Sequence, residues 1–140
     1  PWTRDIALLE LSGDTGAHRR GRAGEHDNIM ATYITQGRYT REAIKGMIVK
    51  PEDRYEALSK HVARAGGRVI GYYLTFGEYD FLAIVEAPGE TQMAAILLSA
   101  AGAGGITDLR TTVALSAVEA KGAFAAAGDL AHSFRTPGGA

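Results

Sequence analysis

The chain has 140 residues, 15 basic and 16 acidic side chains, and no cysteine. This length fits one domain that builds its core without disulfides or metals, and the lack of cysteine excludes thiolate sites and favours a cytoplasmic location. The net charge near zero argues against nucleic acid as a partner. The longest weakly polar stretch, Met93 to Ile106, is too short and glycine-rich to span a membrane, and no signal-peptide pattern is seen.

Residues 1–29 differ in character from the rest of the chain. From residue 12 onward they combine glycine, charged residues and histidine without periodicity, a composition typical of disorder. We therefore predict a disordered extension in front of a domain whose natural start is Met30. The alternative is a basic arm formed by the arginines around residue 20, which is a weak phosphate-binding signal.

A strand followed by a helical arm is predicted next. Residues 31–38 alternate as a strand, with Tyr33 and Thr35 on one side and Ile34 and Gln36 on the other. Thr40 is a good N-cap, and the apolar stripe after it consists of Ala43, Ile44, Met47 and Ile48. Proline suits the first turn of a helix, so Pro51 predicts a break and restart. The arm is then expected to run as one kinked helix to Gly66-Gly67.

The stretch from Arg68 to Ala87 predicts an antiparallel hairpin around Gly77-Glu78, because two β-rich runs flank a short glycine-containing connection. Loops of two or four residues give the same faces, whereas a three-residue loop or a bulge would exchange them. The face expected under the helices carries Ile70, Tyr72, Leu74, Phe76, Tyr79, Phe81, Ala83 and Val85. The other face carries Val69, Gly71, Tyr73, Thr75, Asp80, Leu82, Ile84 and Glu86.

The last third of the chain predicts a helix, a strand and a further short helix. Residues 91–101 place Met93, Leu97 and Ala100 inward, and residues 106–117 form the last strand. Ser116 and Glu119 have the spacing of a capping box, so a helix is expected to run to Gly128 with Phe124 as its anchor. Residues 120–140 are predicted to hold this short helix and a flexible tail.

The order strand, helix, strand, strand, helix, strand predicts an α+β fold, the ferredoxin-like βαββαβ sandwich, over residues 30–119. Both helices of that fold cover one side of an open sheet. The second hairpin face has an apolar centre and therefore needs a cover, and a second copy of the same face would provide it. A homodimer through the sheet face is thus expected.

Two stretches resemble the GYD-domain family of small bacterial proteins. They are MATYITQGRYTREAIKGMIVKPEDR, from Met30, and GYYLTFGEYDFLAIVEAP, from Gly71, in which Gly77, Tyr79 and Asp80 match the residues that give the family its name. The resemblance covers about residues 30–119. It implies a fold of the dimeric α/β-barrel type, and it implies no particular reaction.

Candidate chemistry is sparse. Asp80, beside the hairpin turn, is a candidate general base or substrate anchor, and the alternative is an aspartate that binds turn amides. Arg110 is suited to an anionic ligand or to a structural ion pair. Tyr73 and Tyr79 are suited to packing with a tethered hydroxyl, and the alternative is a role as proton donors. His61 has no second histidine at metal-ligand spacing, so no metal is expected. No motif indicates a cofactor.

The sequence therefore predicts a small-molecule-binding or regulatory homodimer, and the alternative is a cofactor-independent enzyme, monooxygenase-like or isomerase-like, that acts on a small organic substrate. The ligand is expected between sheet and helices or at the dimer layer. Its predicted contacts are Tyr33, Gln36, Tyr73, Thr75, Tyr79, Asp80 and Arg110.

Overall fold

The computed structural model describes residues 29–139. Its elements are β1 (Ala31–Tyr39), α3 (Arg41–Val49), α4 (Arg54–Arg64), β2 (Arg68–Leu74), β3 (Phe81–Ala87), α5 (Glu90–Gly102), β4 (Ile106–Ala114) and α6 (Ala117–Leu130). The predicted extension over residues 1–29 lies outside the described residues except for Ile29.

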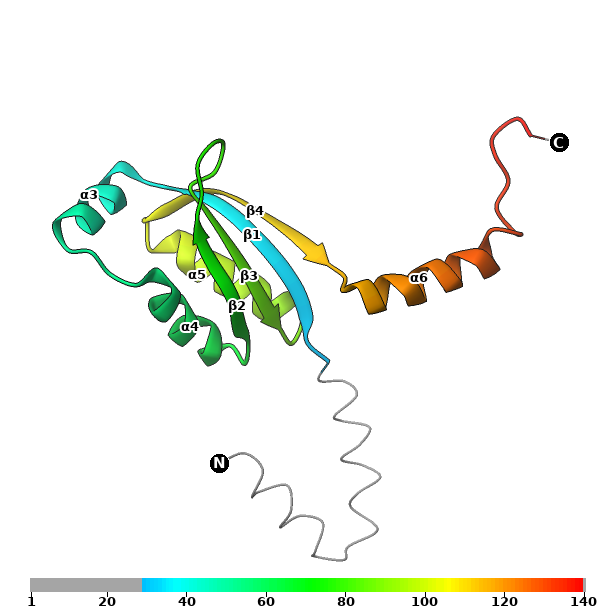
Figure 1. Ribbon diagram of the computed structural model, residues 1–140, viewed down its shortest axis with the longest axis horizontal. Coiled ribbons are helices and arrows are strands. Elements are labelled where there is room, and N and C mark those ends of the chain that lie inside the picture. Colours follow the sequence, from blue (N-terminus) through cyan, green and yellow to red (C-terminus); the bar gives the residue numbers. More distant parts are fainter. Residues whose placement is uncertain (1–28, 140) are drawn as a thin grey trace, which may run out of the picture.

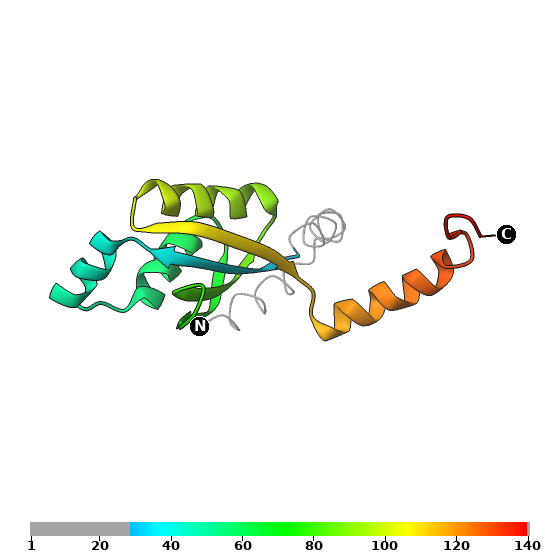
Figure 2. The same ribbon diagram turned by 90° about the horizontal axis from the view of Figure 1, so that it is seen from above.

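The four strands form one sheet in the order β2-β3-β1-β4, and every neighbouring pair is antiparallel (Figure 1). Helices α4 and α5 lie on the same side of this sheet, and α5 is seen clearly on that side in Figure 2. With both connecting helices on one face, this is the ferredoxin-like arrangement. The predicted α+β fold is confirmed.

The core lies between the sheet and the helices α4 and α5. Val62 of α4 and Met93 and Ile96 of α5 are buried against the inward residues of the strands, which are Tyr33, Val69, Ala83, Val85 and Ala87. Helix α4 ends at Arg64, and Gly66, just after the C-cap Ala65, has a φ of +80° that favours glycine and lets the chain turn back into β2. The spacing of apolar residues on α4 and α5 therefore gives each helix one buried stripe.

A β-bulge changes the predicted faces at the start of the hairpin. Leu74 lies opposite Phe81, which is the register that a two-residue loop would have given, but Val69 pairs with Val85 and Gly71 with Ile84. Ile70 is the extra residue of the bulge. Val69 is therefore buried under the helices and Ile70 is exposed, so the prediction for these two residues was wrong. Phe76, also expected under the helices, is 97% exposed at the hairpin tip.

The predicted single kinked helix is in fact two separate helices. Thr40 caps α3 as predicted, and its side chain accepts a hydrogen bond from the amide of Ala43. Helix α4 has its own N-cap, Asp53, which accepts from two backbone amides. No residue of α3 is buried, because α3 projects from the end of the sheet and its apolar stripe has no sheet residues to cover (Figure 1).

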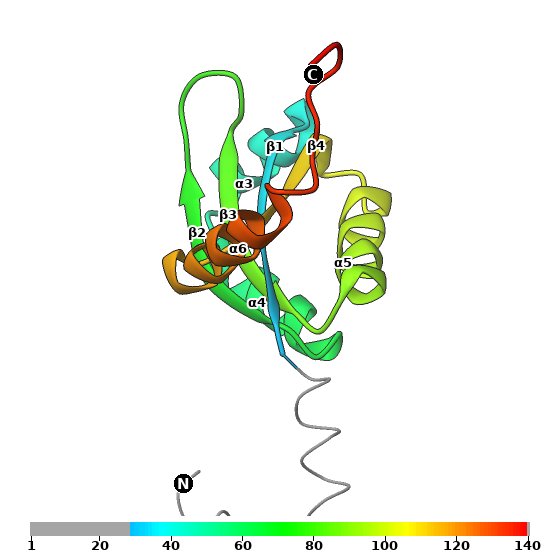
Figure 3. The same ribbon diagram turned by 90° about the vertical axis from the view of Figure 1, so that its right-hand side faces the viewer.

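Helix α6 forms where its capping box predicts. Ser116 and Glu119 exchange both hydrogen bonds of the box, and the preceding strand ends at Ala114 rather than residue 117. No residue of α6 is buried, and the expected anchor Phe124 is 78% exposed. Helices α3 and α6 project from opposite ends of the sheet (Figure 1), and Figure 3 looks along α6 towards the sheet. None of the helices in the described residues has the length and apolarity needed to cross a membrane.

Candidate functional site

Asp80 joins the hairpin to the end of β1. Its Oδ2 accepts a hydrogen bond of 2.9 Å from the backbone N–H of Tyr39, and its own N–H donates to the carbonyl of Gly37 at 2.8 Å. The backbone carbonyl of Asp80 also accepts from the N–H of Thr75 across the hairpin. These bonds give Asp80 a structural role, similar to that of the amide-binding aspartate that is the alternative to a general base. Its role as a general base stays a prediction.

The rest of the hairpin loop is held from β1 as well. Arg38 Nε donates to the carbonyl of Glu78 at 2.8 Å, and its guanidinium lies 6.0 Å from the centre of the Tyr79 ring. Thr75 Oγ1 donates to the carbonyl of Tyr79. Gly77 makes the turn with a φ of +115°, a conformation that residues with a Cβ rarely adopt. The Gly-Tyr-Asp stretch thus fixes the shape of the loop.

Three of the predicted ligand residues lie in one row across the open face of the sheet. The row runs Tyr73, Leu82, Gln36, Arg110, each opposite the next on a neighbouring strand. The next row carries Ile84 and Ile34 at its centre. The open face therefore has an apolar centre and polar ends, as its composition predicted. Tyr33 is not part of this face, because it is 4% exposed in the core on the other side.

A cleft of about 600 Å³ lies between α3, the start of α4, the end of β2 and the hairpin. Its lining combines apolar side chains with polar and charged ones. Thr75 and Asp80 are the predicted site residues that line it. The other lining residues are Tyr39, Ile44, Met47, Ile48, Glu52, Asp53, Arg54, Tyr55, Tyr72, Leu74 and Phe76.

Two of the tyrosines that line the cleft are joined through their hydroxyl groups. Tyr39, at the end of β1, and Tyr72, in β2, share a hydrogen bond between their hydroxyl groups. Both rings pack against Phe81, with ring centres 5.2 Å and 5.7 Å from it. Burial holds the pKa of Tyr72 well above its usual range, the bond to Tyr39 raises this pKa further, and the nearby Arg54 opposes both effects. Tyr72 is therefore a neutral hydrogen-bonding group at physiological pH.

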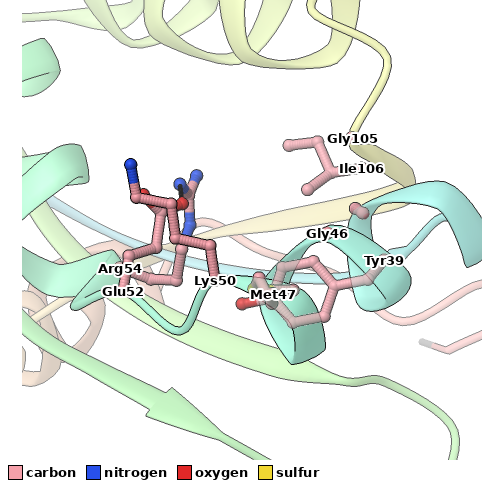
Figure 4. Close-up of a pocket in the computed structure, with 9 residues that line it drawn as sticks. Tyr39, Gly46, Met47, Lys50, Glu52, Arg54, Gly105 and Ile106 are labelled. Carbon is pink, nitrogen blue, oxygen red and sulfur yellow. Dashed lines mark hydrogen bonds and ion pairs between the residues drawn. The ribbon is translucent and has the colours of Figure 1, made fainter.

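Arg54 and Glu52 separate the cleft from a second hollow. The Arg54 guanidinium lies 2.6 Å from a carboxylate oxygen of Glu52, and both residues line the cleft and a hollow of about 330 Å³ beside it. Lys50 lines only this second hollow, and Figure 4 shows it clustered with Arg54 and Glu52, across from Tyr39. The cleft and the hollow together thus carry two cations, Arg54 and Lys50, and the carboxylates of Glu52, Asp53 and Asp80.

These groups suit the binding of an organic molecule. The tyrosine hydroxyls, Arg54 and Lys50 offer donors to a carbonyl or carboxylate, while Ile44 and Met47 offer apolar surface. Within residues 29–139 there is no group of three or more histidine, aspartate and glutamate side chains that could hold a metal ion.

Three residues of the cleft were not predicted as ligand contacts: Tyr39, Tyr72 and Arg54. Tyr72 was assigned to the correct face, but its partner Tyr39 is 33 residues away and Arg54 starts another helix. Only the bend of β1 around Gly37 and the separation of α3 from α4 bring the three together. One feature of the sequence could have indicated Tyr39. It lies directly before the helix cap Thr40, and therefore at the end of the first strand.

The topology defines a ferredoxin-like α+β domain with one face of its sheet uncovered. The model of the GYD domain matches residues 33–124, and the chain belongs to the GYD-domain family. No curated protein matches the chain.

Several solved structures are similar to the chain. An AsnC family transcriptional regulator from Agrobacterium tumefaciens is 19% identical, with a TM-score of 0.42 over 64% of this chain and 52% of that one. A transcriptional regulator from Neisseria meningitidis in complex with L-Met is 16% identical, with a TM-score of 0.45 over 67% and 55%. A protein from Thermus thermophilus is 20% identical, with a TM-score of 0.42 over 63% and 96%. The chain spans about half the length of the two regulators.

Proposed function

We propose that this GYD-domain protein is a small-molecule-binding homodimer with a regulatory role, and that its ligand occupies the cleft beside α3. The observation that carries the proposal is the hydrogen-bonded pair of Tyr39 and Tyr72, which lines the cleft together with Arg54 and several apolar side chains. A cleft of about 600 Å³ is within the usual size range of small-molecule sites. The ligand is an organic molecule of modest size with a polar end, not a metal or a nucleic acid.

The homodimer forms through the open face of the sheet. Leu82, Ile84 and Ile34 make an apolar centre there, and Tyr73 adds a half-exposed aromatic ring. A contact over this face would bury more than about 1,000 Å² in total, the size typical of a specific interface. Gln36 and Arg110, in the same row, then lie at the dimer layer and remain candidate ligand contacts.

The second candidate is a cofactor-independent enzyme, and the tyrosine pair is the observation that favours it, because one hydroxyl could donate a proton to a bound substrate. Binding is favoured over catalysis by Asp80, because its carboxylate accepts a hydrogen bond from the Tyr39 amide and is thereby engaged in the structure. We therefore give the binding function first place.

Native mass spectrometry of the purified protein, searching for a small molecule that copurifies, tests the proposal. Wild type is compared with Tyr72→Phe, which removes the hydroxyl that bonds to Tyr39, and with Tyr73→Phe, which removes the neighbouring hydroxyl on the open face. We expect a bound molecule in wild type and Tyr73→Phe, and loss or at least about tenfold weaker binding in Tyr72→Phe. Equal loss in both variants, or loss only in Tyr73→Phe, would move the site to the dimer layer.

Asp80→Asn tests the contribution of the hairpin carboxylate. This variant keeps the shape and the acceptor oxygen for the Tyr39 amide and removes only the charge. If the ligand is lost while fold and dimer persist, Asp80 belongs to the site. If stability falls while the folded protein still binds, Asp80 is a structural anchor only.

A further inference from the structure

Helix α6 has no buried residue within the part of the chain that the structure describes, residues 29–139. Its 14 residues include two interior glycines, Gly122 and Gly128, and none is buried. An isolated helix of this length is marginal in water, and each interior glycine weakens it by about 0.5–1 kcal/mol relative to alanine. Its large apolar side chains, Val118, Phe124 and Leu130, are all exposed. The capping box starts the helix, but a covering surface is needed to keep it formed.

The rim of the cleft is a second exposed apolar surface in residues 29–139, besides the open sheet face. Phe76 is 97% exposed at the hairpin tip, and Leu74 and Ile48 on either side of the cleft are largely exposed. These side chains leave the cleft open on its outer side. A ligand held by the Tyr39 and Tyr72 hydroxyls would therefore still contact water, unless another element covers the rim.

The topology keeps these two surfaces apart within one chain. The cleft lies at the end of the sheet where β1 finishes, whereas α6 leaves from the end where β1 begins, because Thr32 is paired with Ala114 (Figure 1). Suppose that two copies pack their open sheet faces together around a twofold axis perpendicular to the strands. The end of one sheet where β1 begins then lies beside the end of the other sheet where β1 finishes. In such a pair, each α6 leaves at the end of the assembly where the other copy has its cleft, so any contact between them is made twice by symmetry.

We propose that α6 of a second copy of the chain closes the cleft, with Phe124 packed against the rim formed by Ile48, Leu74 and Phe76. This inference rests on the proposed homodimer and adds that each ligand site is completed by the partner copy. A helix of 14 residues is about 21 Å long, enough to lie across the opening. Two such contacts would add to the area buried by the open sheet faces.

Site-directed crosslinking tests this arrangement cleanly, because the chain has no cysteine of its own. Full-length Phe124→Cys protein is mixed with full-length Phe76→Cys protein, allowed to exchange subunits, and treated with a short bismaleimide. The controls replace Phe76→Cys by Leu98→Cys, an exposed position on α5, and by Tyr73→Cys on the open face. Native mass spectrometry of wild type records the oligomeric state in parallel.

We expect mixed dimers to crosslink at least about tenfold faster for the 124 and 76 pair than for either control. If wild type is a dimer and the 124 and 76 pair reacts no faster than the controls, this inference is wrong while the proposed dimer stands. If wild type is a monomer, the proposed dimer itself fails, and this inference fails with it. Faster reaction of Phe124→Cys with Tyr73→Cys would place α6 on the partner's sheet and overturn closure of the cleft.

Discussion

Helices α4 and α5 differ from α3 and α6 in what they cover, although the sequence marks the beginnings of three of the four equally clearly. Asp53, Thr40 and Ser116 each accept a backbone hydrogen bond at a helix start, whereas α5 has no side-chain cap. Yet only α4 and α5 bury side chains, and α3 and α6 bury none. Capping residues fix where a helix begins. They do not determine what that helix packs against.

The difference divides the molecule into two parts. The sheet face under α4 and α5 contains the core and stabilises the fold within one chain. The cleft, the open sheet face and α6 expose apolar side chains that residues 29–139 leave uncovered. We assign the stability of the domain to the first part, and ligand binding and association to the second.

A charge on the open face should have the largest effect on the second part. Leu82→Asp would bury an unpaired carboxylate in the dimer contact of each copy, at a cost of about 3–5 kcal/mol per buried charge. We expect a monomer or an insoluble chain by light scattering after gel filtration. Leu98→Asp, on the exposed side of α5, is the control and should stay dimeric. A folded, fully dimeric Leu82→Asp protein would contradict the assignment of the face.

Two deletions on α5 compare the covered and exposed sides of one helix. Ile96 is 4% exposed and Leu98 is 74% exposed. Ile96→Ala should lower the free energy of unfolding by about 2–5 kcal/mol, and Leu98→Ala should change it by no more than about 0.5 kcal/mol. Denaturation in urea at constant protein concentration measures both values. Similar losses in the two variants would mean that α5 is covered on both sides.

Two glycine substitutions should have opposite signs in the two regions. A Cβ at Gly37 would lie 2.7 Å from the Phe81 ring and 2.8 Å from Leu109, so Gly37→Ala should destabilise by about 1–3 kcal/mol. A Cβ at Gly46 in α3 meets nothing within 4 Å. Gly46→Ala should therefore stabilise α3 by up to about 1 kcal/mol. Thermal unfolding measures the stability of both variants. A loss of stability in Gly46→Ala would mean that another part of the protein packs against α3.

Tyr72 predicts a dependence on alkaline pH. Its pKa is raised in the folded protein, mainly by burial, while the unfolded chain ionises near pH 10.0. The stabilisation is therefore complete below pH 10.0 and is lost as the pH rises towards the folded pKa. Full linkage would cost wild type about 1 kcal/mol of unfolding free energy between pH 10 and 11, and because Tyr72 is only half-buried we expect the loss that Tyr72→Phe avoids to be smaller than this. Parallel pH curves for the two proteins would exclude this coupling.

The sequence predicted the fold well because its signals are local. The hairpin register, the Thr40 and Ser116 caps and the helical stripe of α4 all depend on residues within a few positions of one another. The bulge at Ile70 was foreseen only as a risk, since nothing in the strand itself marks an extra residue. The error exchanged the predicted faces of Val69 and Ile70 and left Tyr72 and Tyr73 correctly placed.

The candidate site could not be predicted in the same way. Tyr39, Arg54 and Tyr72 come from three elements, and they meet only because α3 projects away from the sheet and leaves an opening beside the end of β1. The apolar stripe of α3 predicted burial, since periodicity reports that a face is apolar and not whether a surface lies opposite it. Of the predicted ligand residues, Thr75 and Asp80 line the cleft, and Gln36, Tyr73 and Arg110 lie on the open face.

Hydrogen exchange of the full chain, measured above and below the concentration at which the dimer dissociates, tests the division between the two regions most directly. We predict that peptides from α4 and α5 keep their protection at both concentrations, because their cover lies within the chain. Peptides from α6 should be protected only in the dimer and should exchange like an unfolded chain on dilution. Equal protection of α6 at both concentrations, or loss of α4 protection together with α6, would contradict the account.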